Sequence, residues 1–341
     1  MTDDGSDLRC AGCSAVGMDS RHCPSCDREL GYRYVALPAH DPTPCAQCGG
    51  TRFDADGRCA HCGRPRRVPD RSAADLGAVA VLTDRGIVHG RNEDAVAAGL
   101  LDSVITGSST AVVIAVSDGV STSARPQVAS GAAVRAGVGA TAAALAAGQP
   151  ATDAIMLGLA AAAEAVREVD VPDGPAPSCT YVSAIVRYSG ADTEITVANV
   201  GDSRAYWLAE AGEEPARRLT VDDSWAQALV DAGAMDERAA MADPRAHTLI
   251  RWLGADSPRE PWADNCVRTM RATGPGMLLL CSDGLWNYLP AASALSGKVA
   301  GAAPAAAANA LAEFALGCGG GDNITVALAP VPWRGRRDDD R

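Results

Sequence analysis

The chain has 341 residues, of which 47% are hydrophobic, and its formal net charge at pH 7 is -12. This length predicts one large core plus a small accessory module. The acidic balance, with Lys298 as the only lysine, argues against a duplex-binding surface built on general positive potential. No run of 18 residues is uninterruptedly apolar, and the first residues lack the pattern of a secretory signal. We therefore expect a cytoplasmic protein with no membrane partner.

Eight of the twelve cysteines lie before residue 63, in four C-x-x-C pairs. These pairs are Cys10/Cys13, Cys23/Cys26, Cys45/Cys48 and Cys59/Cys62. Each half of this tandem repeat can place four thiolates around one tetrahedral ion, which predicts a double zinc ribbon over residues 1–67 with two structural Zn²⁺ ions. Thiolate–zinc binding, at roughly 10–16 kcal/mol, would replace a core that so short a module cannot build. A disulfide framework is the alternative, but a cytoplasmic chain keeps such thiols reduced.

Residues 68–76 are polar and read as a linker, and a second domain is predicted over 77–331, followed by a disordered tail at 332–341. β-type runs are predicted at 78–82, 112–117, 181–187, 194–200, 204–208, 277–282 and 323–329. Helical patterns are predicted at 126–146, 151–168, 223–233 and 304–316. Three strands between 181 and 208 follow one another without a helix. This meander favours an α+β fold of antiparallel sheets with helices on their faces.

Acidic residues follow or precede several of these apolar strands. Asp118 and Asp283 each end a strand and are followed by glycine, and Asp202 and Asp322 lie in similar turns. A single Asp-Gly turn is common and would mean little. Carboxylates at four buried strand ends, however, repel one another unless a cation lies between them. Glu93 and Asp94 add two more carboxylates. Hard oxygen ligands point to magnesium or manganese, and the pattern predicts a multi-metal site that clamps a phosphate and activates water.

These motifs, taken in order, resemble the metal-dependent serine/threonine protein phosphatases of the PPM or type 2C family, over about residues 77–330. The motifs are Asn92-Glu93-Asp94, Asp118-Gly119, Ser178-Cys179-Thr180, Gly201-Asp202-Ser203-Arg204, Ser282-Asp283-Gly284 and Gly321-Asp322-Asn323-Ile324-Thr325. The resemblance implies an α-β-β-α sandwich of two antiparallel sheets flanked by helices. It also implies a bacterial phosphatase that opposes serine/threonine kinases and acts on phosphorylated proteins.

The resemblance also assigns roles to single residues. Asp118 would bridge two Mn²⁺ or Mg²⁺ ions, with Asp283 and Asp322 completing the first ion and Glu93 with the Gly119 carbonyl serving the second. The ions would hold the water that attacks phosphorus, without a phosphoenzyme. Asp94 would support the second ion through water. Asp202 matches the position of a third, weaker metal.

Two positions depart from the family pattern near these ligands. His89 stands where many members have an arginine that grips the substrate phosphate, so His89 either contacts phosphate or is structural. Asn287 stands where members often have a third-metal aspartate, which predicts a weaker or absent third site. The segment that runs from Leu219 to His247 resembles a variable flap beside the active site, which could set substrate choice.

Two other functions stay open on the sequence alone. The chain could be a catalytically weak or inactive phosphatase-fold module that binds partners and is recruited through its ribbons. Alternatively, the ribbons could bind nucleic acid, but residues 1–70 carry nine arginines against ten acidic residues, so a protein contact is favoured.

Overall fold

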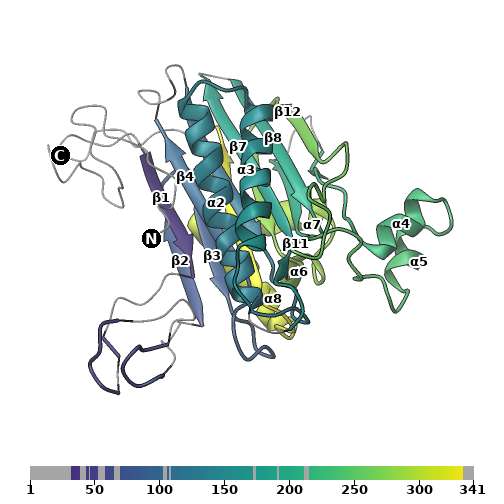
Figure 1. Cartoon of the computed structure of the whole chain (residues 1–341). Coiled ribbons are helices and arrows are strands. Elements are labelled where there is room, and N and C mark those ends of the chain that lie inside the picture. Colours follow the sequence, from purple (N-terminus) through teal and green to yellow (C-terminus); the bar gives the residue numbers. More distant parts are fainter. Residues whose placement is uncertain are drawn as a thin grey trace, which may run out of the picture.

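The computed structural model describes residues 32–38, 44–45, 47–52, 58–64, 70–102, 106, 109–171, 174–189, 192–210 and 215–332. Two six-stranded antiparallel sheets pack face to face, and helices cover their outer faces (Figure 1). The predicted α+β class, an α-β-β-α sandwich, is therefore confirmed.

The first sheet follows a strict two-residue alternation, as its central strand β5 (Thr110–Ser117) shows. Val112, Ile114 and Val116 face the second sheet, whereas Ala111, Val113 and Ala115 face the covering helices. The six strands in spatial order are β1 (Tyr32–Leu37), β4 (Ala95–Leu101), β5, β7 (Tyr181–Ser189), β8 (Asp192–Val200) and β12 (Val267–Ala272).

The second sheet is built around β13 and β14, which are buried along nearly their whole length. In spatial order its strands are β10 (Arg217–Arg218), β9 (Arg204–Ala209), β13 (Gly276–Cys281), β14 (Ile324–Val331), β3 (Ala80–Asp84) and β2 (Arg71–Asp75). A separate short ladder pairs β6 (Ser178–Cys179) with β11 (Leu253–Gly254).

Small residues let the helices approach closely. α2 (Pro126–Ala146) and α3 (Ala151–Arg167) pack on the first sheet, and at their crossing a Cβ on Gly158 would lie 2.7 Å from the Gly137 carbonyl oxygen. α2 is long and apolar enough to cross a membrane, but 67% of its most apolar window is buried inside the protein. The second sheet is covered by α6 (Asp283–Trp286), α7 (Ala292–Val299) and α8 (Pro304–Gly317).

The sheets include residues upstream of Gly77, where we predicted the second domain to begin. β2 lies within the predicted linker at 68–76 and pairs with β3. β1 lies within the predicted ribbon module at 1–67 and pairs with β4 along six residues. Tyr32, Tyr34 and Ala36 pack against the cluster beneath α2, which explains why this segment joins the sheet. Part of the N-terminal region therefore belongs to the sandwich.

Candidate metal centre

Five aspartates meet at one end of the sandwich. Strand pairing explains this, because Ala95 lies opposite Ser117 and Cys281 lies opposite Val326, so loops from both sheets leave at the same end. The five are Asp94 before β4, Asp118 after β5, Asp202 between β8 and β9, Asp283 at the start of α6 and Asp322 before β14. All five were predicted as metal ligands, and the structure brings them together.

Their charges oppose one another in a buried site. Burial raises the pKa of Asp118 well above its ordinary value, and the neighbouring charges of Asp94, Asp283 and Asp322 raise it further. Burial likewise raises the pKa of Asp94 to about 7, with the charges of Asp322 and Asp283 adding to the rise. Such a cluster favours either bound protons or bound cations.

Hydroxyl groups from neighbouring strands fix the aspartates in place. Ser282 Oγ donates to Asp94 Oδ2 at 2.7 Å and accepts from the Thr325 backbone N–H at 3.0 Å. Thr180 Oγ1 accepts from the Asp118 N–H at 3.0 Å and lies 2.7 Å from Ser203 Oγ. Ser282 and Thr180 lie in the quoted motifs, yet sequence reasoning gave them no role.

The loop that carries Glu93 is held by Asn323. Its amide oxygen accepts from the Glu93 N–H at 2.7 Å, and its amide nitrogen donates to the carbonyls of Arg85 and Arg91. The Glu93 carboxylate itself accepts from Arg91 Nε at 2.7 Å and from Ser121 Oγ at 2.6 Å. Its predicted role as a direct metal ligand stays a prediction.

Gly119 must be glycine at this position. Its N–H donates to the Glu93 carbonyl at 3.2 Å, and an added Cβ would lie 2.6 Å from the Pro126 carbonyl oxygen. The loop after β5 therefore passes tightly between two backbone segments, which fixes Asp118 beside it.

His89 and Asn287 both contact predicted metal ligands. His89 Nε2 lies 3.2 Å from Asp322 Oδ1, so a contact between His89 and phosphate stays a prediction. Asn287 Nδ2 donates to Asp283 Oδ2 at 3.1 Å. The amide nitrogen of Asn287 thus orients Asp283.

Two carboxylate oxygens lack a hydrogen-bond partner within the described residues, although both are buried. They are Asp94 Oδ1 and Asp283 Oδ1. Buried polar atoms are normally paired, so each of these oxygens has a free position for a ligand. A crowded set of oxygen donors with free lone pairs fits Mg²⁺ or Mn²⁺.

Metal-free protein should lose stability as the pH rises from about 4 to about 7. In this window folded Asp94 holds a proton that the unfolded carboxyl, with an ordinary pKa of about 3.9, has released. The unfolded chain thus binds fewer protons, and the free energy of unfolding falls by at most about 1.4 kcal/mol per pH unit for this group. Mn²⁺ binds the ionised carboxylates, so its stabilisation should grow over the same window.

Thermal unfolding at pH 5, 6 and 7, with and without added Mn²⁺, measures this linkage. Asp94→Asn should flatten the pH dependence of the metal-free protein. Equal Mn²⁺ stabilisation at all three pH values would contradict the expectation.

The second cysteine repeat forms a cluster. Its four sulfur atoms lie within 4.8 Å of one another, with Cys45 and Cys62 Sγ 3.5 Å apart and Cys48 and Cys59 Sγ also 3.5 Å apart. Backbone N–H groups of Gln47 and Cys48 lower the pKa of Cys45 to about 6, which favours the thiolate that a metal requires. The first repeat, with Cys10, Cys13, Cys23 and Cys26, lies outside the described residues.

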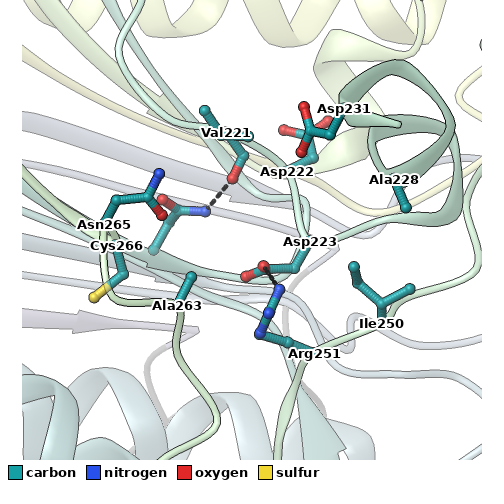
Figure 2. Close-up of a pocket in the computed structure, with 11 residues that line it drawn as sticks. Val221, Asp222, Asp223, Ala228, Asp231, Ile250, Arg251, Ala263, Asn265 and Cys266 are labelled. Atoms are coloured by element: carbon teal, nitrogen blue, oxygen red, sulfur yellow. Dashed lines mark hydrogen bonds and ion pairs between the residues drawn. The ribbon is translucent and has the colours of Figure 1, made fainter. Parts of the chain in front are cut away.

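A flap, defined here as residues 222–252, contains α4 (Trp225–Asp231) and α5 (Glu237–Met241), and these two helices project away from the sandwich (Figure 1). Figure 2 shows the pocket at its base, where Asp223 Oδ1 accepts from Arg251 Nη1 at 2.8 Å. Asp223 also accepts from the Gly201 N–H at 3.1 Å through Oδ2, and its own N–H donates to the Gly201 carbonyl at 2.8 Å. The base of the flap is therefore attached to the turn that carries Asp202.

Relatives of the chain are bacterial phosphatases. Serine/threonine phosphatase stp of Listeria innocua is 36% identical over 149 residues, which are 44% of this chain and 55% of that protein. Serine/threonine protein phosphatase PstP of Mycobacterium tuberculosis is 31% identical over 258 residues, which are 74% of this chain and 44% of that protein. The chain thus spans about half the length of the curated relatives it matches. No protein-family model matches the sequence.

Solved structures share the fold. The PPM Ser-Thr phosphatase MsPP of Mycobacterium smegmatis, crystallised with cacodylate, is 26% identical with a TM-score of 0.55, and the match covers 75% of this chain and 99% of that one. The sandwich, the order of the acidic motifs and these likenesses agree. The region that carries the five aspartates has the fold of PPM-type phosphatases and is similar in sequence to bacterial serine/threonine phosphatases of that family.

Proposed function

We propose that this chain removes phosphate from phosphoserine and phosphothreonine side chains of proteins, with two Mn²⁺ or Mg²⁺ ions as cofactors. The observation that carries the proposal is the meeting of Asp118 with Asp94, Asp283 and Asp322 at one end of the sandwich. In this proposal Asp118 would contact both ions, Asp283 and Asp322 would complete the ligands of the first ion, and Glu93 with the Gly119 carbonyl would serve the second. When bound, the ions would activate a water and neutralise charge on the phosphoryl oxygens.

The residues around the aspartates position them and the substrate. Ser282 and Thr180 hold Asp94 and Asp118, so the ligands are arranged before any ion binds. Arg91, whose side chain is 54% exposed, holds Glu93 and presents a guanidinium at the rim of the site. A guanidinium there can receive phosphate oxygens, in place of the arginine that His89 replaces.

Hydrolysis of a phosphothreonine peptide in the presence of Mn²⁺ tests the proposal. Phosphate release should need Mn²⁺ or Mg²⁺ and should stop when the ions are omitted. Folded, metal-loaded protein that leaves phosphoserine and phosphothreonine peptides intact would refute it. An inactive binding module, the other function considered, is disfavoured by the complete set of five aspartates.

We further propose that the cysteine repeats bind zinc in a double ribbon and contact proteins, such as a serine/threonine kinase or its substrates, in the cytoplasm. Four sulfurs within 4.8 Å leave no open position for water, which suits a structural site.

Elemental analysis of purified protein should find about two zinc ions per chain if both repeats bind metal. Cys59→Ser should lower the content by one, because three thiolates hold zinc much less tightly than four. Cys318→Ser is the control, since Cys318 is an exposed cysteine far along the chain from either repeat. An unchanged zinc content in Cys59→Ser would contradict the assignment.

A further inference from the structure

The loop between β3 and β4 exposes two consecutive apolar side chains. Val88 is 71% exposed and Ile87 is 61% exposed, and within the described residues these are the two most exposed large hydrophobic side chains. Single exposed hydrophobic residues are common on protein surfaces, but these two are adjacent. Neither side chain belongs to the core of the sandwich, so both are available for contact with another molecule.

Both residues lie beside the metal centre. The N–H groups of Ile87 and Val88 donate to the Gly320 carbonyl at 2.9 and 3.3 Å. Gly320 lies two residues before Asp322 in the chain. His89 follows Val88, and its Nε2 atom lies 3.2 Å from Asp322 Oδ1. Consecutive Cα atoms are about 3.8 Å apart, so the Cα atoms of Val88 and Ile87 lie within about 4 and about 8 Å of that of His89.

Hydrogen bonds hold this loop at both ends. The Asn323 amide nitrogen donates to the carbonyls of Arg85 at 2.6 Å and of Arg91 at 3.1 Å. The Arg85 guanidinium donates to the His89 carbonyl, which closes the loop across the apolar pair. Because the loop is already ordered, a ligand that covers the pair loses little free energy in ordering it.

The apolar surface continues past Ile87. A Cβ on Gly320 would lie 3.0 Å from Ile87 Cγ1 and 3.1 Å from Leu316 Cδ2, so both side chains cover the same glycine. Arg91, which we propose for phosphate contact, lies three residues after Val88 on the same loop, and its side chain is 54% exposed. The loop therefore offers a cation for a phosphate and, close by, an apolar surface for a neighbouring side chain.

We propose that Ile87 and Val88 form a subsite that binds an apolar side chain of the phosphoprotein substrate, one to three residues from its phosphorylated serine or threonine. The inference rests on the proposed function, because the substrate phosphate must reach the metal centre. An extended substrate chain spans at most about 3.6 Å per residue, so three residues reach about 11 Å from the phosphorylated one. That reach exceeds the span from His89 back to Ile87. Burial of an apolar side chain against two β-branched residues then favours substrates that carry one.

Hydrolysis of matched phosphothreonine peptides by the full-length, Mn²⁺-loaded protein tests the proposal. In the reference peptide the three residues on each side of the phosphothreonine are serine. Each test peptide has either leucine, or asparagine of similar size, at one of these positions. We expect leucine at its best position to raise kcat/KM about tenfold, mainly by lowering KM, because small differences in buried apolar surface already change kcat/KM by about that factor. Asparagine should give no gain.

Variants of the pair assign the preference to this loop. Ile87→Ser with Val88→Ser should bring the leucine-to-serine ratio of kcat/KM close to one, whereas Ile87→Leu with Val88→Leu should keep it high. Leu157→Ser is the matched control, since Leu157 is 51% exposed on α3, and it should keep the ratio of wild type. Thermal unfolding should show that all three variants remain folded, because the changed side chains are exposed.

Equal kcat/KM for all peptides in wild type overturns the proposal, as does an unchanged leucine preference in Ile87→Ser with Val88→Ser. Analytical ultracentrifugation tests for another occupant of the surface. A wild-type dimer that the serine variant makes monomeric would assign the pair to a contact between two copies and overturn the proposal. Folded, metal-loaded wild type that hydrolyses none of the peptides would instead refute the proposed function, and this inference falls with it.

Discussion

Asp118→Asn should lower the rate of phosphothreonine peptide hydrolysis at saturating Mn²⁺ by at least about 10³-fold, equivalent to about 4 kcal/mol of transition-state stabilisation. Asp118 is the residue whose charge interacts with Asp94, Asp283, Asp322 and Asp202 together. Asparagine keeps the shape of the side chain but brings no negative charge, so two cations can no longer share this position. Phosphate release in steady state, at several Mn²⁺ concentrations, measures the loss.

The same substitution should not damage the fold. Burial and like charges raise the pKa of Asp118, so a neutral amide removes a repulsion that the metal-free protein tolerates only by keeping a proton. Metal-free Asp118→Asn should therefore melt at or above the temperature of metal-free wild type. Asp192→Asn, an exposed change at the start of β8, is the matched control and should keep full activity. Full activity in Asp118→Asn would refute the two-metal assignment.

The sequence predicted most of the central strands because their apolar runs are continuous or alternate with a period of two. β5, β7, β8, β9, β13 and β14 lie within a few residues of the predicted runs. It missed β4 (Ala95–Leu101), because four of its seven residues are alanine or glycine and Val96 is its one β-branched residue. It also missed β12 at the sheet edge, where Arg268 and Arg271 interrupt the apolar pattern.

The candidate site could be predicted where the type of a residue and its place in the sequence together indicate its chemistry. Aspartates at strand ends required a cation, and the structure gathers Asp94, Asp118, Asp202, Asp283 and Asp322. His247 could not be assigned in this way, since only folding of the flap brings it to Asp202 and Asp283. The same holds for Ser282, because its bond to Asp94 joins residues 188 positions apart.

The strand β1 shows a different limit of sequence reasoning. Its residues lie between two cysteine repeats, so spacing alone assigned them to the ribbons. Their pairing with β4 depends on an unpaired sheet edge that exists only in the folded domain. A segment between two cysteine repeats can thus join the first sheet of the sandwich.

Arg204→Ala should cost about 3–5 kcal/mol in the free energy of unfolding, because it leaves a buried carboxylate without its main partner. Arg204 is 3% exposed and binds Asp222 with Nε at 3.0 Å and Nη2 at 2.6 Å. Its guanidinium also stacks on Trp286. In the part of the chain that the structure describes, the other cation near Asp222 is Arg218, whose Nη1 lies 3.6 Å from Asp222 Oδ2. Urea unfolding followed by tryptophan fluorescence, with Mn²⁺ present and absent, measures the loss.

The double variant Arg204→Met with Asp222→Leu separates the cost of the unpaired charge from the cost of lost packing. It should be more stable than Arg204→Ala, because no charge is left buried and the new side chains fill similar volumes. Arg204→Lys should fall between wild type and Arg204→Ala, since an ammonium keeps the charge but loses the bidentate bond and the planar stack on the indole. A loss below about 1 kcal/mol in Arg204→Ala would show that Arg218 can replace Arg204. Arg204 and His247 both stack on the indole ring of Trp286. If the predicted order holds, this ring owes its position to the buried ion pair between Arg204 and Asp222, which links β9 to the base of the flap.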